Sequence, residues 1–265
     1  EISCSLVGSE MCIRDSISLS LLLAVCAMVY SQPVQEVGRV IERYAMGRKV
    51  PVKVSVSLDK RNGCDVFETS VKNGKLHINA SSGVAACRAF YEYVKSQGAG
   101  IVSWSGNRLE LPAELADLDK RTVISPFKHH YYFNVVTFGY TTPYWDWARW
   151  EREIDWMALH GIDMPLALVA NEAISARVWK KLGLTEQEIA DYFVGPAHLP
   201  WMRMGNISGI DGPLPAEWQE AQVDLQHKIL NRMRGLGMKP VCPGFAGFLP
   251  QAMKRIFPGM KLIET

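Results

Sequence analysis

The feature that most constrains the fold is a repeat in the second half of the chain. From Tyr131 onward a short apolar run of strand length is followed by a loop and then by a segment with helical spacing. The apolar runs cover residues 132–137, 164–169 and 239–243. Fully apolar strands that alternate with helices predict parallel pairing, with the helices packed outside the sheet.

Parallel strands of this kind form a barrel or a doubly wound sheet. No glycine-rich phosphate loop follows the first strand, which disfavours a dinucleotide-binding sheet. The loops after the strands are long, as expected where a barrel builds its active face. A (β/α)8 barrel takes about 250 residues, whereas 131–265 holds 135. We therefore expect an α/β fold that contains only the first part of a barrel.

Apolar residues at helical spacing predict the helices between these strands. Thr185, with Glu188 three residues later, forms a capping-box pattern at one helix start, and a loop rich in Gly and Pro covers 195–215. A further strand is expected to begin at 260–263. The predicted helices cover 145–159, 173–182, 185–193, 217–236 and 250–256.

The first half predicts a small α/β domain over residues 32–112. Strands are indicated by period-two alternation and by Asn73-Gly74, a strong hairpin turn between two apolar runs. The charged segment 113–127, bounded by prolines, is interpreted as a linker, and the barrel domain takes 128–265. The elements expected in the small domain are helices at 34–45 and 83–95 and strands at 52–56, 66–71, 76–78, 101–104 and 108–111.

The first 31 residues are predicted to lie outside the fold. Residues 17–31 combine an apolar run, too short to span a bilayer, with small residues before a cleavage site at Ser31, as in a signal peptide. Residues 1–16 carry acidic residues and two cysteines, and resemble translated adapter DNA; a genuine but unusual N-terminus is the alternative. We expect a secreted or periplasmic protein, lysosomal if the source is eukaryotic, without a membrane span.

Composition excludes several classes of partner. The net charge is +2 with no basic run, which argues against nucleic acid. Three cysteines remain after the signal peptide, Cys64, Cys87 and Cys242; their spacing does not suit a metal, and they can form at most one disulfide. We expect no metal and no cofactor, and the oligomeric state stays open.

Side chains at the carboxyl ends of barrel strands and in the following loops line the active face. An amide, a phenol and an indole around one cavity suit a sugar, because they bind hydroxyls and stack on apolar ring faces. The candidates are Asn134, Val136, Thr137, Tyr140, Asn171, Glu172, Trp201, Met204, Gly205, Asn206, Asp211, Gly244, Phe245 and Gly247.

Each candidate also has a structural interpretation. Asn134 and Tyr140 could form a hydrogen-bonded pair that fixes their loop, and Trp201 could close the barrel rim. For Glu172 we favour a helix-capping role, since acidic residues stabilise helix N-termini. Acidic residues on the helix 145–159 predict a solvated or ion-paired face, for instance Arg149 with Glu153.

Four stretches carry a resemblance to a known family. YYFNVVTFGYTTPYWDWARWEREIDWMALHGID, GPAHLPWMRMGNI, DGPLP and GMKPVCPGFAGFLP resemble the α-N-acetylglucosaminidases of glycoside hydrolase family 89. The similarity runs from about Tyr131 to the end, and is weaker before it. It implies a retaining exo-hydrolase that removes terminal α-linked N-acetylglucosamine from glycans without a cofactor.

The resemblance also assigns roles. It implies sugar contacts for Asn134, Tyr140, Trp201 and Met204, and it places Val136 where human-type enzymes have Cys. Retaining glycosidases use two carboxylates about 5–5.5 Å apart; by the resemblance, both are expected beyond Thr265. The residues present alone would then be inactive, and unstable because a part-barrel leaves an open strand edge.

Two other functions remain open from the sequence. A non-catalytic sugar-binding protein would keep the aromatic pocket without the acids, and an unrelated extracellular α/β enzyme would not bind N-acetylglucosamine at all.

Overall fold

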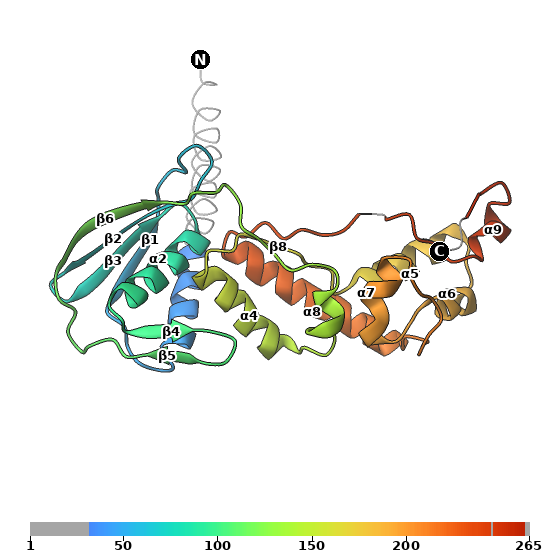
Figure 1. The fold of residues 1–265 in the computed structure, drawn as a ribbon, viewed down its shortest axis with the longest axis horizontal. Helices are drawn as coiled ribbons and strands as arrows, with labels where there is room; N and C mark the ends of the chain where they lie inside the picture. The colour runs from blue at the N-terminus through green and yellow to red at the C-terminus, as the bar shows by residue number, and fades with distance from the viewer. Residues whose placement is uncertain (1–31, 245, 263–265) are drawn as a thin grey trace, which may run out of the picture. The chain divides into compact units, whose positions relative to one another are not determined.

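The computed structural model describes residues 32–244 and 246–262 (Figure 1). The predicted adapter peptide 1–16, the signal peptide 17–31 and the candidate Phe245 lie outside the described residues. The chain divides into two compact units, Glu1–Pro126 and Phe127–Thr265, and each is described by itself.

The first unit is built on a four-stranded sheet in the order β1-β3-β2-β6. β1 (Val52–Val56) pairs in parallel with β3 (Lys75–Ala80), and β3 pairs antiparallel with β2 (Val66–Lys72). Asn73 and Gly74 join β2 to β3 with φ of 51° and 67°, the left-handed geometry that the Asn-Gly pair predicted. The hairpin prediction is thus confirmed.

Helical segments cover the sheet of this unit. α2 (Gly83–Ser96) packs against β1, β2 and β3 (Figure 1), and Ser82 caps its first turn. The chain is also helical over 32–44, and this helix ends at Tyr44, whose hydroxyl donates to the carbonyl of Arg108 at 2.9 Å. Burial raises the pKa of Tyr44 above its ordinary value. Arg108 belongs to β5 (Asn107–Leu109), which forms a hairpin with β4 (Gly100–Val102).

The predicted linker 113–127 is wrong for seven of its 15 residues. Residues Leu118–Ile124 form β6, which pairs antiparallel with β2 at the edge of the sheet. Charged residues are common on edge strands, where they prevent unwanted pairing, and Lys120 and Thr122 both bond Glu68 on β2. The charge that suggested a linker therefore belongs to an edge strand.

Parallel strands start the second unit, as predicted. β7 (Tyr131–Tyr132) pairs in parallel with β8 (Met164–Pro165), and Leu166 makes a parallel bridge to Val241. Three segments that follow one another in the sequence are thus neighbours in space, which is the order of a barrel and confirms the α/β class.

The strands are much shorter than their apolar runs. The strand predicted at 132–137 ends at Tyr132, because Phe133 takes a φ of 72° and α3 (Thr137–Tyr140) follows. The predicted strand 239–243 is reduced to the bridge at Val241, and residues 260–262 form no strand.

The predicted helices of the second unit are confirmed to within a few residues. α4 (Trp147–Leu159) and α8 (Ala216–Gly235) lie side by side (Figure 1). An ion pair of 3.0 Å joins Asp155 on α4 to Arg232 on α8. Thr185 and Glu188 form the predicted capping box, and a hydrogen bond from Arg255 is the main cause that lowers the pKa of Glu188 to about 2. These helices are α4 (Trp147–Leu159), α5 (Asn171–Leu182), α6 (Glu186–Tyr192), α8 (Ala216–Gly235) and α9 (Met253–Ile256).

The segment predicted as a loop at 195–215 contains helical structure. A 3-10 turn, η1 (Pro196–His198), leads into α7 (Leu199–Arg203). Pro200 stands in the first turn of α7, where proline is well tolerated. Gly205 follows the end of α7 with a φ of 76°. The proline and glycine that indicated a loop therefore mark the limits of a short helix.

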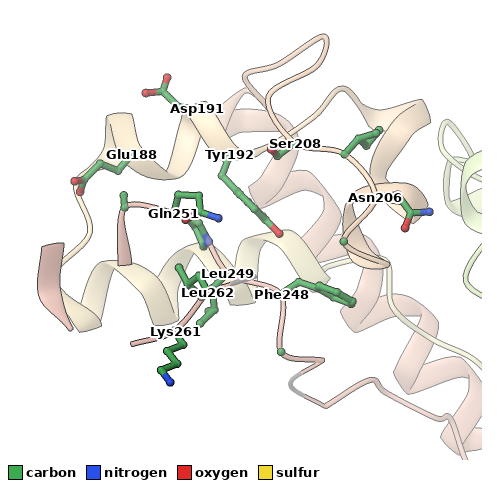
Figure 2. Close-up of a pocket in the computed structure, with 15 residues that line it drawn as sticks. Glu188, Asp191, Tyr192, Asn206, Ser208, Phe248, Leu249, Gln251, Lys261 and Leu262 are labelled. Atoms are coloured by element: carbon green, nitrogen blue, oxygen red, sulfur yellow. The ribbon is translucent and has the colours of Figure 1, made fainter. Parts of the chain in front are cut away.

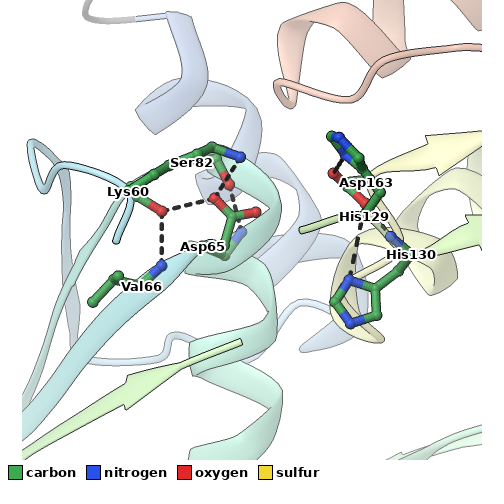
Figure 3. A network of polar contacts seen from close by, with 9 residues as sticks. Lys60, Asp65, Val66, Ser82, His129, His130 and Asp163 are labelled. Carbon is green, nitrogen blue, oxygen red and sulfur yellow. Dashed lines mark hydrogen bonds and ion pairs between the residues drawn. The ribbon is translucent and has the colours of Figure 1, made fainter. Parts of the chain in front are cut away.

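The buried residue Asp163 connects the starts of the strands in the second unit through its carboxylate and its backbone carbonyl. Asp163 accepts hydrogen bonds from the backbone N–H of His130 at 2.6 Å and contacts Nδ1 of His129 at 3.2 Å (Figure 3). Its carbonyl accepts from the backbone N–H of Lys239 at 2.7 Å. One residue thus connects the segments that begin β7, β8 and the strand position at Val241.

Cys64, Cys87 and Cys242 are free thiols in the structure. Across 32–244 and 246–262, no helix has the length and apolar character needed to cross a bilayer.

Candidate functional site

Two short helices meet at the carboxyl side of β7. The ring of Tyr140, at the end of α3, lies edge-on to the ring of Trp201 on α7, with centroids 5.2 Å apart and an interplanar angle of 86°. Gly139 permits this approach, because a Cβ added there would lie 2.6 Å from Cγ of Pro200. The structure therefore brings together two of the four residues to which we assigned sugar contacts.

The other two residues of that set flank the same short helices, Asn134 before α3 and Met204 after α7. The Asn134 side-chain oxygen accepts from the backbone N–H and the hydroxyl of Thr137, both at 3.0 Å, so it fixes the start of α3. The partner of this loop-fixing contact is thus Thr137, where the structural interpretation had Tyr140. Met204 is the C-cap residue that follows α7, and its N–H donates to the carbonyl of Pro200 at 3.1 Å.

We had favoured a helix-capping role for Glu172, but α5 begins without a side-chain cap hydrogen bond. The Glu172 carboxylate is 1% exposed and accepts two hydrogen bonds from Arg203, from Nε and Nη2, each at 2.7 Å. The guanidinium also lies 6.0 Å from the ring centroid of Phe138 on α3. Glu172 is therefore held in a fork with Arg203, a residue that we had not selected from the sequence.

Other candidates lie in a separate hollow of the second unit. Gly205, Asn206 and Gly247 line a cavity of about 780 Å³, together with residues of α6 and the segment before α9 (Figure 2). The Phe248 ring packs against Gly205, where an added Cβ would lie 2.2 Å from it. Asn134, Tyr140, Trp201 and Met204 do not line this cavity.

The remaining candidates have local partners or open surroundings. Asp211 pairs with His198 at 2.9 Å, Asn171 lies 3.5 Å from Glu172, and Gly244 has no heavy atom within 4 Å of its Cβ position. Arg149 and Glu153 form the predicted ion pair at 2.9 Å, and Glu153 is buried and also bonded by Tyr132.

The close packing at Gly139 leads to a stability prediction. Gly139→Ala in the full-length protein is expected to lower the free energy of unfolding by about 1–3 kcal/mol, because the methyl group forces Pro200 and Trp201 away from α3. Thermal unfolding measures the loss. Gly244→Ala is the matched control, since among the described residues none beyond its chain neighbours lies within 4 Å of a Cβ added there. Equal unfolding temperatures for the two variants would contradict the prediction.

Comparison with known proteins identifies the family of both units. Residues 130–265 match the family model of the alpha-N-acetylglucosaminidase (NAGLU) tim-barrel domain, and residues 35–116 match the model of its N-terminal domain. The chain is 44% identical to human alpha-N-acetylglucosaminidase over 215 residues, which cover 80% of this chain and 29% of the human protein.

Solved structures give the same assignment. A family 89 glycoside hydrolase from Clostridium perfringens, in complex with 2-acetamido-1,2-dideoxynojirmycin, matches with a TM-score of 0.83 and 27% identity over 90% of this chain and 27% of that one. A form of the Clostridium enzyme with two Glu-to-Gln substitutions, in complex with its substrate GlcNAc-alpha-1,4-galactose, matches with a TM-score of 0.81 and 28% identity, over 88% and 27% of the two chains. The chain thus spans less than a third of the length of these relatives. With both of its halves matched in order by the models of a single family, the chain belongs to the alpha-N-acetylglucosaminidases of glycoside hydrolase family 89.

Proposed function

We propose that this protein is a retaining exo-glycosidase that hydrolyses terminal α-linked N-acetylglucosamine from glycans. The observation that carries the proposal is the aromatic corner of Tyr140 and Trp201, built by the segments that follow the barrel strands. In a barrel, that side of the strands holds the active site. The 44% identity to the human enzyme and the substrate named in the Clostridium complex support the same sugar.

The four residues of the corner would take different parts in binding. Trp201 and Tyr140 offer aromatic faces and edges for the apolar side of a sugar ring, and Tyr140 is 74% exposed, so its ring is accessible. The Asn134 amide would reach a hydroxyl, while Met204 would add an apolar contact. Val136, in place of a cysteine in human-type enzymes, would remove a thiol contact and alter substrate preference.

The two catalytic carboxylates are proposed to lie beyond Thr265. Glu172 follows β8 at the carboxyl end, yet both of its oxygens are engaged by Arg203. A nucleophile or a general acid needs a carboxylate oxygen that is free to reach the substrate, and in Glu172 both oxygens already accept from the guanidinium. The substrate complex of the Clostridium enzyme carries two Glu-to-Gln substitutions, which supports a requirement for a pair of glutamates.

Export from the cytosol belongs to the same proposal. The apolar run before Ser31 supports a cleaved leader, and with it a protein that is secreted, periplasmic or, in a eukaryote, lysosomal.

The test is an assay of the full-length protein on 4-nitrophenyl α-N-acetylglucosaminide. We expect hydrolysis with retention at the anomeric carbon, observed by proton NMR of the first-formed sugar, and no hydrolysis of the β-anomer. A protein limited to residues 32–265 is expected to be inactive, and activity from it would contradict the assignment of the carboxylates. Binding of N-acetylglucosamine without hydrolysis by the full-length protein would favour the non-catalytic alternative.

A further inference from the structure

The fork between Glu172 and Arg203 joins three segments that surround the aromatic corner. Glu172 stands in the first turn of α5, the first helix after β8, and Arg203 is the last residue of α7. The guanidinium of Arg203 also faces the ring of Phe138, on α3. The side chains of Glu172 and Arg203 are 1% and 9% exposed, so solvent does not screen the contact.

Stability alone does not account for this arrangement. A buried ion pair often stabilises a fold no better than apolar side chains of similar size, because both charges lose their hydration. Nη1 of Arg203 is buried and has no hydrogen-bond partner among the described residues, which adds a cost. A bidentate fork does, however, fix the direction of both side chains, which a single point contact does not.

The direction that the fork fixes is that of the proposed sugar contacts. α7 has five residues, and Trp201 and Met204 stand two and one positions from Arg203. On α3, Phe138 packs near Arg203 while Tyr140, two residues later, packs against Trp201. A short helix has little stability of its own, so the position of Trp201 depends on what holds α7 to the rest of the unit.

We propose that Glu172 and Arg203 are positioning residues, which hold Trp201 and Tyr140 in the geometry that binds the sugar. The proposal rests on the proposed function, because it assigns the purpose of the fork to the same site. Neither side chain needs to touch the substrate.

The experiment compares stability with activity in the full-length protein. Arg203→Met leaves Glu172 buried without its partner, so it is expected to lower both the unfolding temperature and kcat/KM. The double variant Glu172→Leu with Arg203→Met replaces the pair by apolar side chains, and is expected to recover the unfolding temperature. Its kcat/KM is expected to stay at least 10-fold below that of the unsubstituted protein, mainly through KM, because small misplacements of binding groups cost up to about 100-fold.

A purely structural role gives a different result. If the double variant recovers both the unfolding temperature and kcat/KM, the proposal is overturned. Arg203→Lys keeps the charge but not the fork, so it serves as a second variant if the double variant does not fold. We expect Arg203→Lys to raise KM at least fivefold with an unfolding temperature close to that of the unsubstituted protein, and an unchanged KM would overturn the proposal.

A second buried ion pair provides the matched control. Asp155 on α4 and Arg232 on α8 are 3.0 Å apart and comparably buried, but neither belongs to the segments that carry the aromatic corner. Asp155→Leu with Arg232→Met is expected to leave kcat/KM within twofold of the unsubstituted protein.

Amide hydrogen exchange separates this proposal from the proposed function. The N–H groups of Met204, Gly205 and Asn206 bond carbonyls within α7, and their exchange reports the order of α7 whether or not the protein is an enzyme. We expect these amides to exchange at least 10-fold faster in the double variant than in the Asp155–Arg232 control. If the unsubstituted protein does not hydrolyse the substrate, the proposed function fails. Unchanged amide exchange in the double variant would overturn the positioning role, whether or not the protein is an enzyme.

Discussion

Trp201→Ala in the full-length protein is expected to lower kcat/KM for 4-nitrophenyl α-N-acetylglucosaminide by about 100-fold. Truncation of a tryptophan at the centre of a binding site typically costs about 2–4 kcal/mol, and each 1.4 kcal/mol is a factor of 10. The loss has two sources, the face that stacks on the sugar and the edge-on contact that holds Tyr140 at 5.2 Å. Steady-state kinetics measure it, with the larger change expected in KM.

Two further variants make this result specific. Trp201→Phe keeps an aromatic face of smaller area and is expected to fall between the alanine variant and the unsubstituted protein. Trp104→Ala is the control, because Trp104 is half exposed and belongs to the first unit; its kcat/KM should change by less than twofold. Equal losses for Trp201→Ala and Trp104→Ala would show that Trp201 has no particular role in binding.

Local patterns were sufficient to predict most helices and the hairpins of the first unit. Asn73-Gly74 and the pair of Thr185 and Glu188 act within a few residues, through backbone geometry and capping. Such signals do not depend on the rest of the fold, so a single sequence contains them.

Strand lengths could not be predicted in the same way. An apolar run such as 132–137 satisfies the pattern of a buried strand, yet only Tyr131–Tyr132 finds a partner, because Phe133 turns the chain into α3. The edge strand Leu118–Ile124 was missed for the opposite reason, since its charges suit a solvated edge as well as a linker. Pairing depends on the neighbouring strand, which the local sequence does not describe.

The position of the candidate site remains a prediction from barrel geometry, whereas its supporting contacts could not be predicted from the sequence. Barrel geometry alone directs attention to residues after each strand, which include Asn134, Tyr140 and Trp201, while their roles come only from the family resemblance. The fork is different, because Glu172 and Arg203 are 31 residues apart and no local spacing relates them. The available signal was Arg203 at the end of the apolar segment LPWMR. It indicates that the arginine side chain is buried, but it does not identify the residue that pairs with it.

The largest loss of stability is expected from Asp163→Ala. The substitution leaves the backbone N–H of His130 without its 2.6 Å acceptor, in a site where Asp163 is 4% exposed. Hydrogen bonds to charged groups contribute about 1.5–3 kcal/mol each, and the substitution removes both the bond from the His130 N–H and the contact with His129, so we expect a loss of about 3–5 kcal/mol. This corresponds to an unfolding temperature lower by roughly 6–20 °C for a domain of 150–250 residues, measured by calorimetry or by fluorescence during heating.

Two comparison variants and the location of Asp163 make this prediction specific. Asp163→Asn keeps an oxygen for the His130 N–H and is expected to lose less than half as much, whereas Asp191→Ala, at an exposed position on α6, should lose no more than about 0.5 kcal/mol. Asp163 lies before β8, at the end of the strands opposite to Tyr140 and Trp201, where barrels hold residues for stability. The folded fraction of Asp163→Ala should therefore keep its kcat/KM, since the carboxylate connects strand starts and takes no part in the aromatic corner. An unfolding temperature equal to that of Asp191→Ala would show that the starts of the strands are held by other contacts.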